Sequence, residues 1–335
     1  MIEARSADVD TPVLNVEKLQ VSFKTPHGLV RAVNSVSYAI RPGEAVGILG
    51  ESGSGKSVSA SAVMGLLDSP PAEITGAIHF RDIDLLNGQS SETAGIRGDR
   101  VAMVFQDAIT ALNPGLTIGY QIGEIFRVHR PGTSWRDATE KAIALMDQVK
   151  IPSARQRVKS YPHEFSGGMS QRIMIAMAIA LSPDVLIADE PTTALDVTVQ
   201  AQIMQLLAEL RRDTGMALIL ITHDIGVVAE ATDRVMVMYA GRIVERGPTA
   251  DIVARPAHPY TVGLMNSVPR AEMKHEKLHT IDGAPPVMTA IPSGCAFHPR
   301  CTRQQQVCKS DRPDLRAIQA ERESACHFAG DVLDG

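Results

Sequence analysis

The sequence predicts an α/β protein whose central β-sheet is parallel and covered by helices on both faces. Short apolar segments, such as residues 185–188 and 217–221, alternate with longer segments of helical spacing, such as residues 197–212. Strands that are apolar on both faces are typical of parallel sheets, because helices pack against each side. A glycine-rich loop at residues 50–57 joins an apolar segment to a helical one, which agrees with this fold class.

The composition excludes several classes of protein. The 335 residues correspond to about two domains. Hydrophobic residues make up 44% and charged residues 21% of the chain, so it is not wholly disordered. The net charge of −5 gives no sign of a nucleic-acid partner, and none is expected. The longest apolar run, residues 173–181, is too short to span a bilayer, which needs about 20 residues. The polar N-terminus lacks a secretory signal, so we expect a cytosolic chain.

The individual elements follow from apolar spacing and from turn residues. Strands are predicted at residues 13–23, 29–40, 45–49, 74–80, 101–105, 185–188 and 217–221. Helices are predicted at residues 56–67, 135–149, 169–181 and 197–212. Helices and loops from residue 107 to about 165 interrupt this alternation, which indicates an insertion. Residues 234–239 and 242–245 should form a hairpin around Ala240 and Gly241, and residues 1–12 an irregular tail.

The segment GESGSGKS at residues 50–57 matches the pattern G-x-x-x-x-G-K-[ST]. Its glycines let backbone N–H groups turn inward as an anion nest, and the following helix adds its positive N-terminal end. Lys56 then reaches the β- and γ-phosphates of a nucleotide, and Ser57 offers its hydroxyl to Mg²⁺. The alternative is a glycine turn with a chance lysine, but the strand before the loop and the helix after it favour ATP. The predicted ATP-binding residues here are Gly50, Ser52, Gly53, Ser54, Gly55, Lys56 and Ser57.

Two adjacent acids end the apolar segment at residues 185–188. Asp189 stands where this kind of fold places a second Mg²⁺ ligand. Glu190 comes next and can orient or deprotonate an attacking water. Two acids at a solvated strand end are the alternative, and the phosphate loop elsewhere in the chain favours the catalytic interpretation.

Residues 165–172, FSGGMSQR, resemble the signature motif of ATP-binding cassette (ABC) transporters, although the family usually has Leu where this chain has Phe165. Ser166 can cap the following helix, and Gly167 and Gly168 expose backbone N–H groups to an anion. Three further segments resemble the family in the expected order. They are the Q-loop glutamine at Gln106, the D-loop at residues 193–196 with Asp196, and the switch histidine at His223.

The resemblance implies an α/β P-loop NTPase of ABC type. It implies a RecA-like core, an antiparallel β subdomain and an inserted helical subdomain at about residues 107–168, all within a nucleotide-binding domain at residues 1–255. Two such domains close head to tail on ATP. Adenine is expected to stack on Phe23, with a core phenylalanine as the alternative. The implied catalytic residues are Glu190, His223 and Gln106. The implied Mg²⁺ ligands are Ser57, Gln106 and Asp189. The partner's ATP site is completed by Ser166, Gly167, Gly168 and Asp196.

Other segments resemble the peptide/nickel importer branch of the family: residues 107–114, 161–164, 258–261, 283–286 and 292–295. The implied function is ATP hydrolysis that energises import of peptides. The implied partners are two membrane-spanning permease subunits, contacted through residues 107–125, a second ATPase subunit that is identical or homologous, and an extracytoplasmic solute-binding protein. The implied location is peripheral, at the cytoplasmic face of the inner membrane. Alternatives are an importer of nickel or another small solute, a soluble ABC ATPase, an exporter subunit, and a tail that acts as an independent metal-binding module.

Four cysteines lie in the C-terminal extension at residues 256–335: Cys295, Cys301, Cys308 and Cys326. Their spacing is neither the paired C-x₂-C of structural zinc nor the compact run of ferredoxins. Disulfides are disfavoured in the cytosol, soft thiolates select zinc or iron–sulfur, and a small module often needs a metal. The spacing resembles the peptide-importer extension, in which some members carry a 4Fe–4S cluster. We expect that cluster, with zinc second and four free thiols as the alternative.

Overall fold

The computed structural model describes residues 11–193, 195–267 and 281–334. These residues form two compact units. The first contains the described residues up to Leu14 together with residues 40–44 and 80–219. The second contains residues 15–39 and 45–79 and the described residues from 220 onward. The boundary between the two units crosses strand β8 (Ala217–Thr222).

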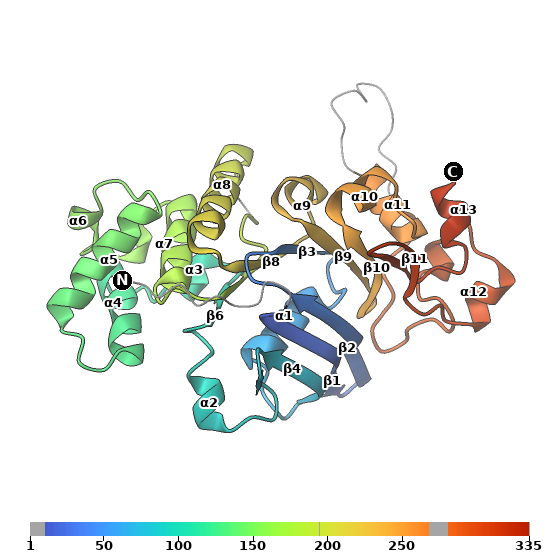
Figure 1. Ribbon diagram of the computed structural model, residues 1–335, viewed down its shortest axis with the longest axis horizontal. Helices are drawn as coiled ribbons and strands as arrows, with labels where there is room; N and C mark the ends of the chain where they lie inside the picture. The colour runs from blue at the N-terminus through green and yellow to red at the C-terminus, as the bar shows by residue number, and fades with distance from the viewer. Residues whose placement is uncertain (1–10, 194, 268–280, 335) are drawn as a thin grey trace. The chain divides into compact units, whose positions relative to one another are not determined.

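The first unit combines a parallel strand pair with a helical region. Strands β6 (Val101–Val104) and β7 (Val185–Asp189) pair in parallel, with Val101 opposite Val185. Figure 1 shows α4, α5 and α6 gathered together, and α4 packs on α5 and α7. The helices of this unit are α2 (Ser90–Ala94), α3 (Ala108–Ala111), α4 (Ile118–His129), α5 (Trp135–Gln148), α6 (Ala154–Arg157), η1 (Pro162–Glu164), α7 (Gly167–Ile179) and α8 (Val197–Thr214), and the short strand β5 is Ile83–Asp84.

The second unit contains strands of two sheets. In one sheet, the order is β2 (Gly28–Ile40), β1 (Leu14–Thr25), β4 (Ala72–Phe80). In the other, β3 (Ala45–Leu49) pairs in parallel with β9 (Arg234–Tyr239), which forms an antiparallel hairpin with β10 (Arg242–Pro248). The helices are α1 (Lys56–Met64), α9 (Ile225–Ala231), α10 (Thr249–Ala254), α11 (Pro259–Asn266), η2 (His298–Arg300), α12 (Gln306–Ser310) and α13 (Ala329–Leu333).

Most predicted elements are confirmed, with small shifts at their ends. The helix predicted at residues 56–67 stops at Met64, because Gly65 takes a left-handed conformation (φ 64°) and caps the helix through its N–H. The hairpin around Ala240 and Gly241 is confirmed. The predicted α/β fold class is confirmed as well, because parallel strand pairs alternate with helices along the chain. Of the predicted tail at residues 1–12, the first ten lie outside the described residues.

The C-terminal extension adds two strands that the sequence did not predict. Strand β12 (Arg322–Ser324) pairs antiparallel with β10, and β11 (Arg316–Gln319) pairs with β12. These strands continue the sheet of the second unit past residue 255 (Figure 1). The predicted domain boundary between residues 255 and 256 stays a prediction.

A buried ion pair anchors these strands. Arg322 donates to Glu245 at 3.0 Å, and the two side chains are 3% and 0% exposed. The Glu245 carboxylate also accepts the backbone N–H groups of Ala257 and His258, at 2.7 and 3.0 Å. Burial raises the pKa of Glu245, while the hydrogen bonds from the Ala257 N–H and from Arg322 oppose that rise. Removal of either partner would leave a buried charge unpaired, so the pair is needed for the stability of this part of the fold.

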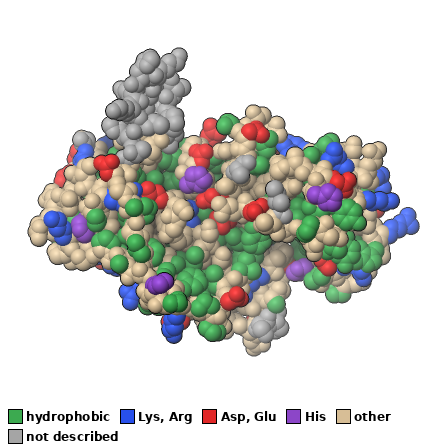
Figure 2. Space-filling model, turned by 180° about the vertical axis from the view of Figure 1, so that it is seen from behind, with side chains coloured by type: hydrophobic (Ala, Val, Ile, Leu, Met, Phe, Trp, Pro, Cys, Tyr) green, Lys and Arg blue, Asp and Glu red, His purple; other side chains and the backbone are tan. Residues whose placement is uncertain are grey.

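The surface mixes charged, polar and hydrophobic side chains. Figure 2 shows acidic and basic groups spread among hydrophobic ones on the face that it presents. Across residues 11–193, 195–267 and 281–334, the structure contains no helix that is long and apolar enough to cross a membrane.

Candidate functional site

The phosphate loop at residues 50–57 lies between β3 and α1, as the motif requires. Two of its glycines touch main chain from elsewhere in the second unit. A Cβ on Gly50 would lie 2.3 Å from the Met238 carbonyl oxygen, and one on Gly55 would lie 2.2 Å from the Ala32 carbonyl oxygen. Gly55 also has a φ of 101°. Only glycine fits at either position, so the loop has one defined backbone path.

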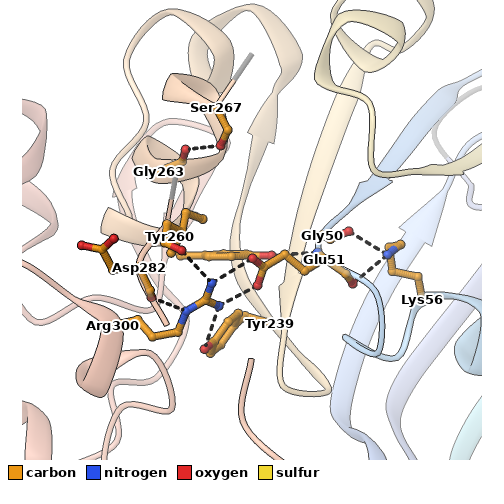
Figure 3. Close-up of polar contacts among 10 residues, drawn as sticks. Gly50, Glu51, Lys56, Tyr239, Tyr260, Gly263, Ser267, Asp282 and Arg300 are labelled. Atoms are coloured by element: carbon orange, nitrogen blue, oxygen red, sulfur yellow. Dashed lines mark hydrogen bonds and ion pairs between the residues drawn. The ribbon is translucent and has the colours of Figure 1, made fainter. Parts of the chain in front are cut away.

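Lys56 and Ser54 are the buried polar groups of this loop. Lys56 is 4% exposed, and its ammonium donates to the carbonyl oxygens of Gly50 at 2.7 Å and Glu51 at 3.0 Å (Figure 3). The Ser54 hydroxyl oxygen is buried and has no hydrogen-bond partner within the part of the chain that the structure describes. A buried hydroxyl of this kind normally has a partner, which an anion in the loop would supply. Ser52, Gly53 and Ser57 are exposed at the loop surface.

The two acids at the end of β7 belong to the first unit. Asp189 is buried as the last residue of the strand, and Glu190 is half-buried with a φ of 45°. The Glu190 Oε2 atom accepts hydrogen bonds from Gln106 Nε2 at 2.9 Å and from Thr193 Oγ1 at 2.8 Å. The structure therefore brings together two predicted residues, Gln106 and Glu190. A left-handed conformation at a non-glycine residue is strained, and such strain is common at functional sites.

Thr193 was predicted as part of the D-loop, but its hydrogen bond to Glu190 was not predicted from the sequence. Its position three residues after Glu190 could have indicated a side chain that folds back on the carboxylate. Part of the predicted D-loop, Ala194, lies outside the described residues. Asp196 accepts from the Val199 N–H at 2.9 Å and so caps α8.

The signature segment also lies in the first unit and begins α7. The Ser166 hydroxyl accepts from the Met169 N–H at 3.4 Å, which makes it the helix cap. Gly167 and Gly168 form the first turn. A Cβ on Gly168 would lie 2.6 Å from Val199 Cγ1, so a side chain would displace α8 at this point. At the start of α7, the N–H groups of Gly167 and Gly168 are therefore not covered by side chains of their own.

His223 and Phe23 lie in the second unit, as the phosphate loop does. His223 is exposed between β8 and α9, directly before Asp224, which caps α9. Phe23 is half-buried near the end of β1. Their predicted roles, switch histidine and adenine platform, stay predictions.

All four cysteines line one cavity in the second unit, together with His258, His298 and His327. Burial raises the pKa of Cys295 and Cys301, and it raises that of Cys326 to about 11, with smaller contributions from the other three thiols. The four groups are thus close enough to influence one another. In residues 11–193, 195–267 and 281–334, no three His, Cys, Asp or Glu side chains are arranged as a metal-binding group.

These features together define an ATPase of the ABC class. A family model described as ABC transporter matches residues 33–193, and one described as oligopeptide/dipeptide transporter, C-terminal region, matches residues 244–308. Over about 70% of the chain, the fold resembles a bacterial ABC transporter cassette solved as a dimer, with 28% identity, a TM-score of 0.63 and 98% of that chain covered. A related dimer in a post-hydrolysis state with ADP and Pi gives the same TM-score at 27% identity.

Curated relatives identify the branch. The oligopeptide transport ATP-binding protein OppD of Salmonella typhimurium is 49% identical over 314 residues, which cover 94% of this chain and 93% of that protein. The dipeptide transport ATP-binding protein DppD of Escherichia coli is 47% identical over 316 residues, with 94% and 96% covered. The chain belongs to this family of oligopeptide and dipeptide transport ATP-binding proteins. The family and the ATPase class that the motifs predicted are confirmed.

We predict that Gly55→Ala destabilises the protein more than Gly53→Ala. Both glycines have a positive φ, so each substitution should cost about 1–2 kcal/mol for the backbone conformation. Only at Gly55 would the new methyl group also overlap a main-chain carbonyl, that of Ala32, whereas Gly53 faces open space. Urea unfolding of the two variants tests this difference. Equal losses of unfolding free energy would show that close packing does not fix the loop.

Proposed function

We propose that the chain is the ATP-hydrolysing subunit of a dipeptide or oligopeptide importer. The observation that carries this proposal is the match to oligopeptide and dipeptide transport ATP-binding proteins over 94% of the chain, C-terminal region included. The names of these relatives refer to peptides, which favours peptides over nickel as the solute. The extension also argues against a bare soluble ATPase, because its matched model belongs to peptide transporters.

ATP binds through the phosphate loop in this proposal. The buried Lys56 ammonium and the buried Ser54 hydroxyl support it, since both groups gain a partner when phosphate enters the loop. Mg²⁺ is held by oxygen ligands, which Ser57, Gln106 and Asp189 provide. When bound, the ion neutralises charge on the β- and γ-phosphates. Phe23 stacks on adenine.

Hydrolysis depends on Glu190, which acts as the general base for water. Its carboxylate already has a fixed orientation, because Gln106 and Thr193 both donate to the same oxygen. The oriented carboxylate is the group that accepts the proton from the attacking water. His223 contacts the γ-phosphate. Ser166, Gly167, Gly168 and Asp196 complete the ATP site of a second ATPase subunit, identical or homologous, when two cassettes close head to tail.

The chain works at the cytoplasmic face of the inner membrane, docked on two permease subunits that receive peptide from an extracytoplasmic binding protein. Residues 107–125 provide the contact. An exposed aromatic side chain of this segment supports that role: Tyr120 is 39% exposed, and its ring stacks on that of Trp135, the equally exposed first residue of α5, with ring centroids 4.7 Å apart. Arg127 covers the Trp135 ring at 4.4 Å. Exposed aromatic groups next to arginine are typical of protein interfaces.

We predict that Lys56→Ala and Glu190→Gln separate ATP binding from hydrolysis. Lys56→Ala should abolish measurable nucleotide binding, because the charge that neutralises phosphate is lost. Glu190→Gln should keep binding but lower kcat by about 10²–10⁴-fold, the usual contribution of a general base. Calorimetric titration and a phosphate-release assay measure the two effects, with Lys159→Ala and Glu230→Gln as exposed controls. Unchanged affinity in the first variant, or normal turnover in the second, would contradict the assignments.

We also propose that the C-terminal extension binds a 4Fe–4S cluster, with zinc as the second candidate. Its support is the donor set: Cys295, Cys301, Cys308 and Cys326 all face one cavity that also has apolar walls. Thiols are the ligands that both iron–sulfur clusters and zinc prefer. Burial raises the pKa of the Cys295, Cys301 and Cys326 thiols and so disfavours their thiolates, and a bound metal would supply the positive charge that stabilises them. The cluster would hold the extension together.

We predict that protein purified without oxygen is brown and contains about four irons and four sulfides per chain. Cys301→Ser should lose the metal. Iron, zinc and acid-labile sulfide analyses decide the question. One zinc without sulfide would show that the cavity selects zinc, and a folded, metal-free protein would show four free thiols instead.

A further inference from the structure

We propose that Arg300, in the C-terminal extension, is a positioning residue for the phosphate loop and thereby sets the affinity for ATP. It acts on Glu51, the second residue of the loop motif, to which neither the motif nor the proposed function gives a role. The inference rests on the proposed binding of ATP at residues 50–57. It makes the extension a direct determinant of nucleotide affinity.

Glu51 is held at three separate points (Figure 3). Its carboxylate accepts two hydrogen bonds from the Arg300 guanidinium, at 2.7 Å from Nη1 to Oε2 and at 3.0 Å from Nη2 to Oε1. Its N–H donates to the Tyr260 hydroxyl at 2.8 Å, and its carbonyl oxygen accepts from the Lys56 ammonium at 3.0 Å. The loop residue that contacts Lys56 is therefore fixed from outside the loop, at both its side chain and its backbone.

Arg300 is itself immobilised. Its side chain is only 5% exposed, and that of Glu51 is 25% exposed, so water screens their contact weakly. The Arg300 Nε atom donates to the Asp282 carbonyl oxygen at 3.0 Å. The guanidinium carbon also lies 5.9 Å from the ring centroids of both Tyr239 and Phe297. A two-point, charge-assisted pair in such surroundings has one geometry, which is what a positioning role requires.

The same arrangement connects the loop to the packing of the extension. Tyr260, the second residue of α11, is fully buried, and its ring lies against those of Tyr239 and Phe297. Arg300 ends η2 and is followed directly by Cys301, which lines the four-cysteine cavity. A displacement of the backbone at Arg300 would therefore reach the phosphate loop through the ion pair with Glu51.

The consequence for nucleotide binding concerns Lys56. The Glu51 carbonyl oxygen accepts a hydrogen bond from the ammonium, and Arg300 fixes the residue that bears this oxygen. Without the pair, the loop must be ordered when ATP binds, and affinity falls by the cost of that ordering. Chemistry at saturating ATP changes little, because Arg300 contacts none of the groups assigned to hydrolysis.

The test is calorimetric titration of the full chain with ATP, together with steady-state hydrolysis and hydrogen exchange of the amides at residues 50–57. Arg300→Gln should weaken ATP binding by about tenfold to a hundredfold, the range for a lost charge-assisted hydrogen bond, while kcat at saturating ATP stays close to the unsubstituted value. The loop amides should exchange faster. Arg300→Lys should have an ATP affinity between those of Arg300→Gln and the unsubstituted chain, since lysine keeps the charge but not the two-point geometry.

The matched control is Arg303→Gln, an exposed arginine of the same extension that also lines the cysteine cavity but donates to the Asp331 carbonyl oxygen. It should leave ATP affinity unchanged. Glu51→Gln removes the same ion pair from the loop side, so it should reproduce the loss of affinity. The double variant Glu51→Gln, Arg300→Gln should bind ATP no more weakly than either single variant, because both remove one interaction.

Normal ATP affinity in both Arg300→Gln and Glu51→Gln, alongside abolished binding in Lys56→Ala, would overturn the inference and leave the proposed function intact. Normal affinity in Lys56→Ala as well would instead overturn the proposed phosphate site. If Arg300→Gln does not fold, Glu51→Gln decides. Additive losses in the double variant would show that the two residues act separately, which also contradicts the inference.

Discussion

The close approach of main-chain carbonyls to the phosphate loop is the constraint on which the candidate site depends. The oxygens of Ala32 and Met238 lie where a side chain on Gly55 or Gly50 would stand, so the loop takes a single path. That path sets the start of α1 and directs Lys56 inward, where it is buried against loop carbonyls. The two oxygens belong to β2 and β9, so the path of the loop depends on how these strands pack against it. The position of Lys56 and of the loop's N–H groups therefore depends on packing within the second unit.

The sequence predicted the parts of the molecule that depend on local signals. The strand before the phosphate loop, the helix after it, and the acids that end β7 all follow from short-range patterns, and the structure contains them. The end of α1 was predicted three residues too late, because the stop is the left-handed Gly65 and not the later prolines. The roles of His223 and Phe23 depend on a nucleotide, so neither pattern nor geometry of the chain alone decides them.

Contacts between distant segments were beyond sequence reasoning. Arg300 and Glu51 are 249 residues apart, and nothing in the spacing of either indicates the other. The same holds for Arg322 and Glu245, and for β12, whose three residues carry too weak an apolar pattern to predict a strand. The contact between Thr193 and Glu190 differs, because the two residues are only three positions apart in the sequence. Such contacts make the extension part of the second unit's core and not a loosely attached tail.

ATP-driven peptide uptake by the reconstituted importer tests the central claim most directly. The chain would be combined in proteoliposomes with its permease subunits, its companion ATPase subunit and a peptide-loaded binding protein. We predict that labelled peptide accumulates only with Mg²⁺ and ATP on the side of this chain, and that a non-hydrolysable ATP analogue does not support accumulation. Equal accumulation without ATP, or ATP hydrolysis that continues at one rate whether or not permease and peptide are present, would contradict it.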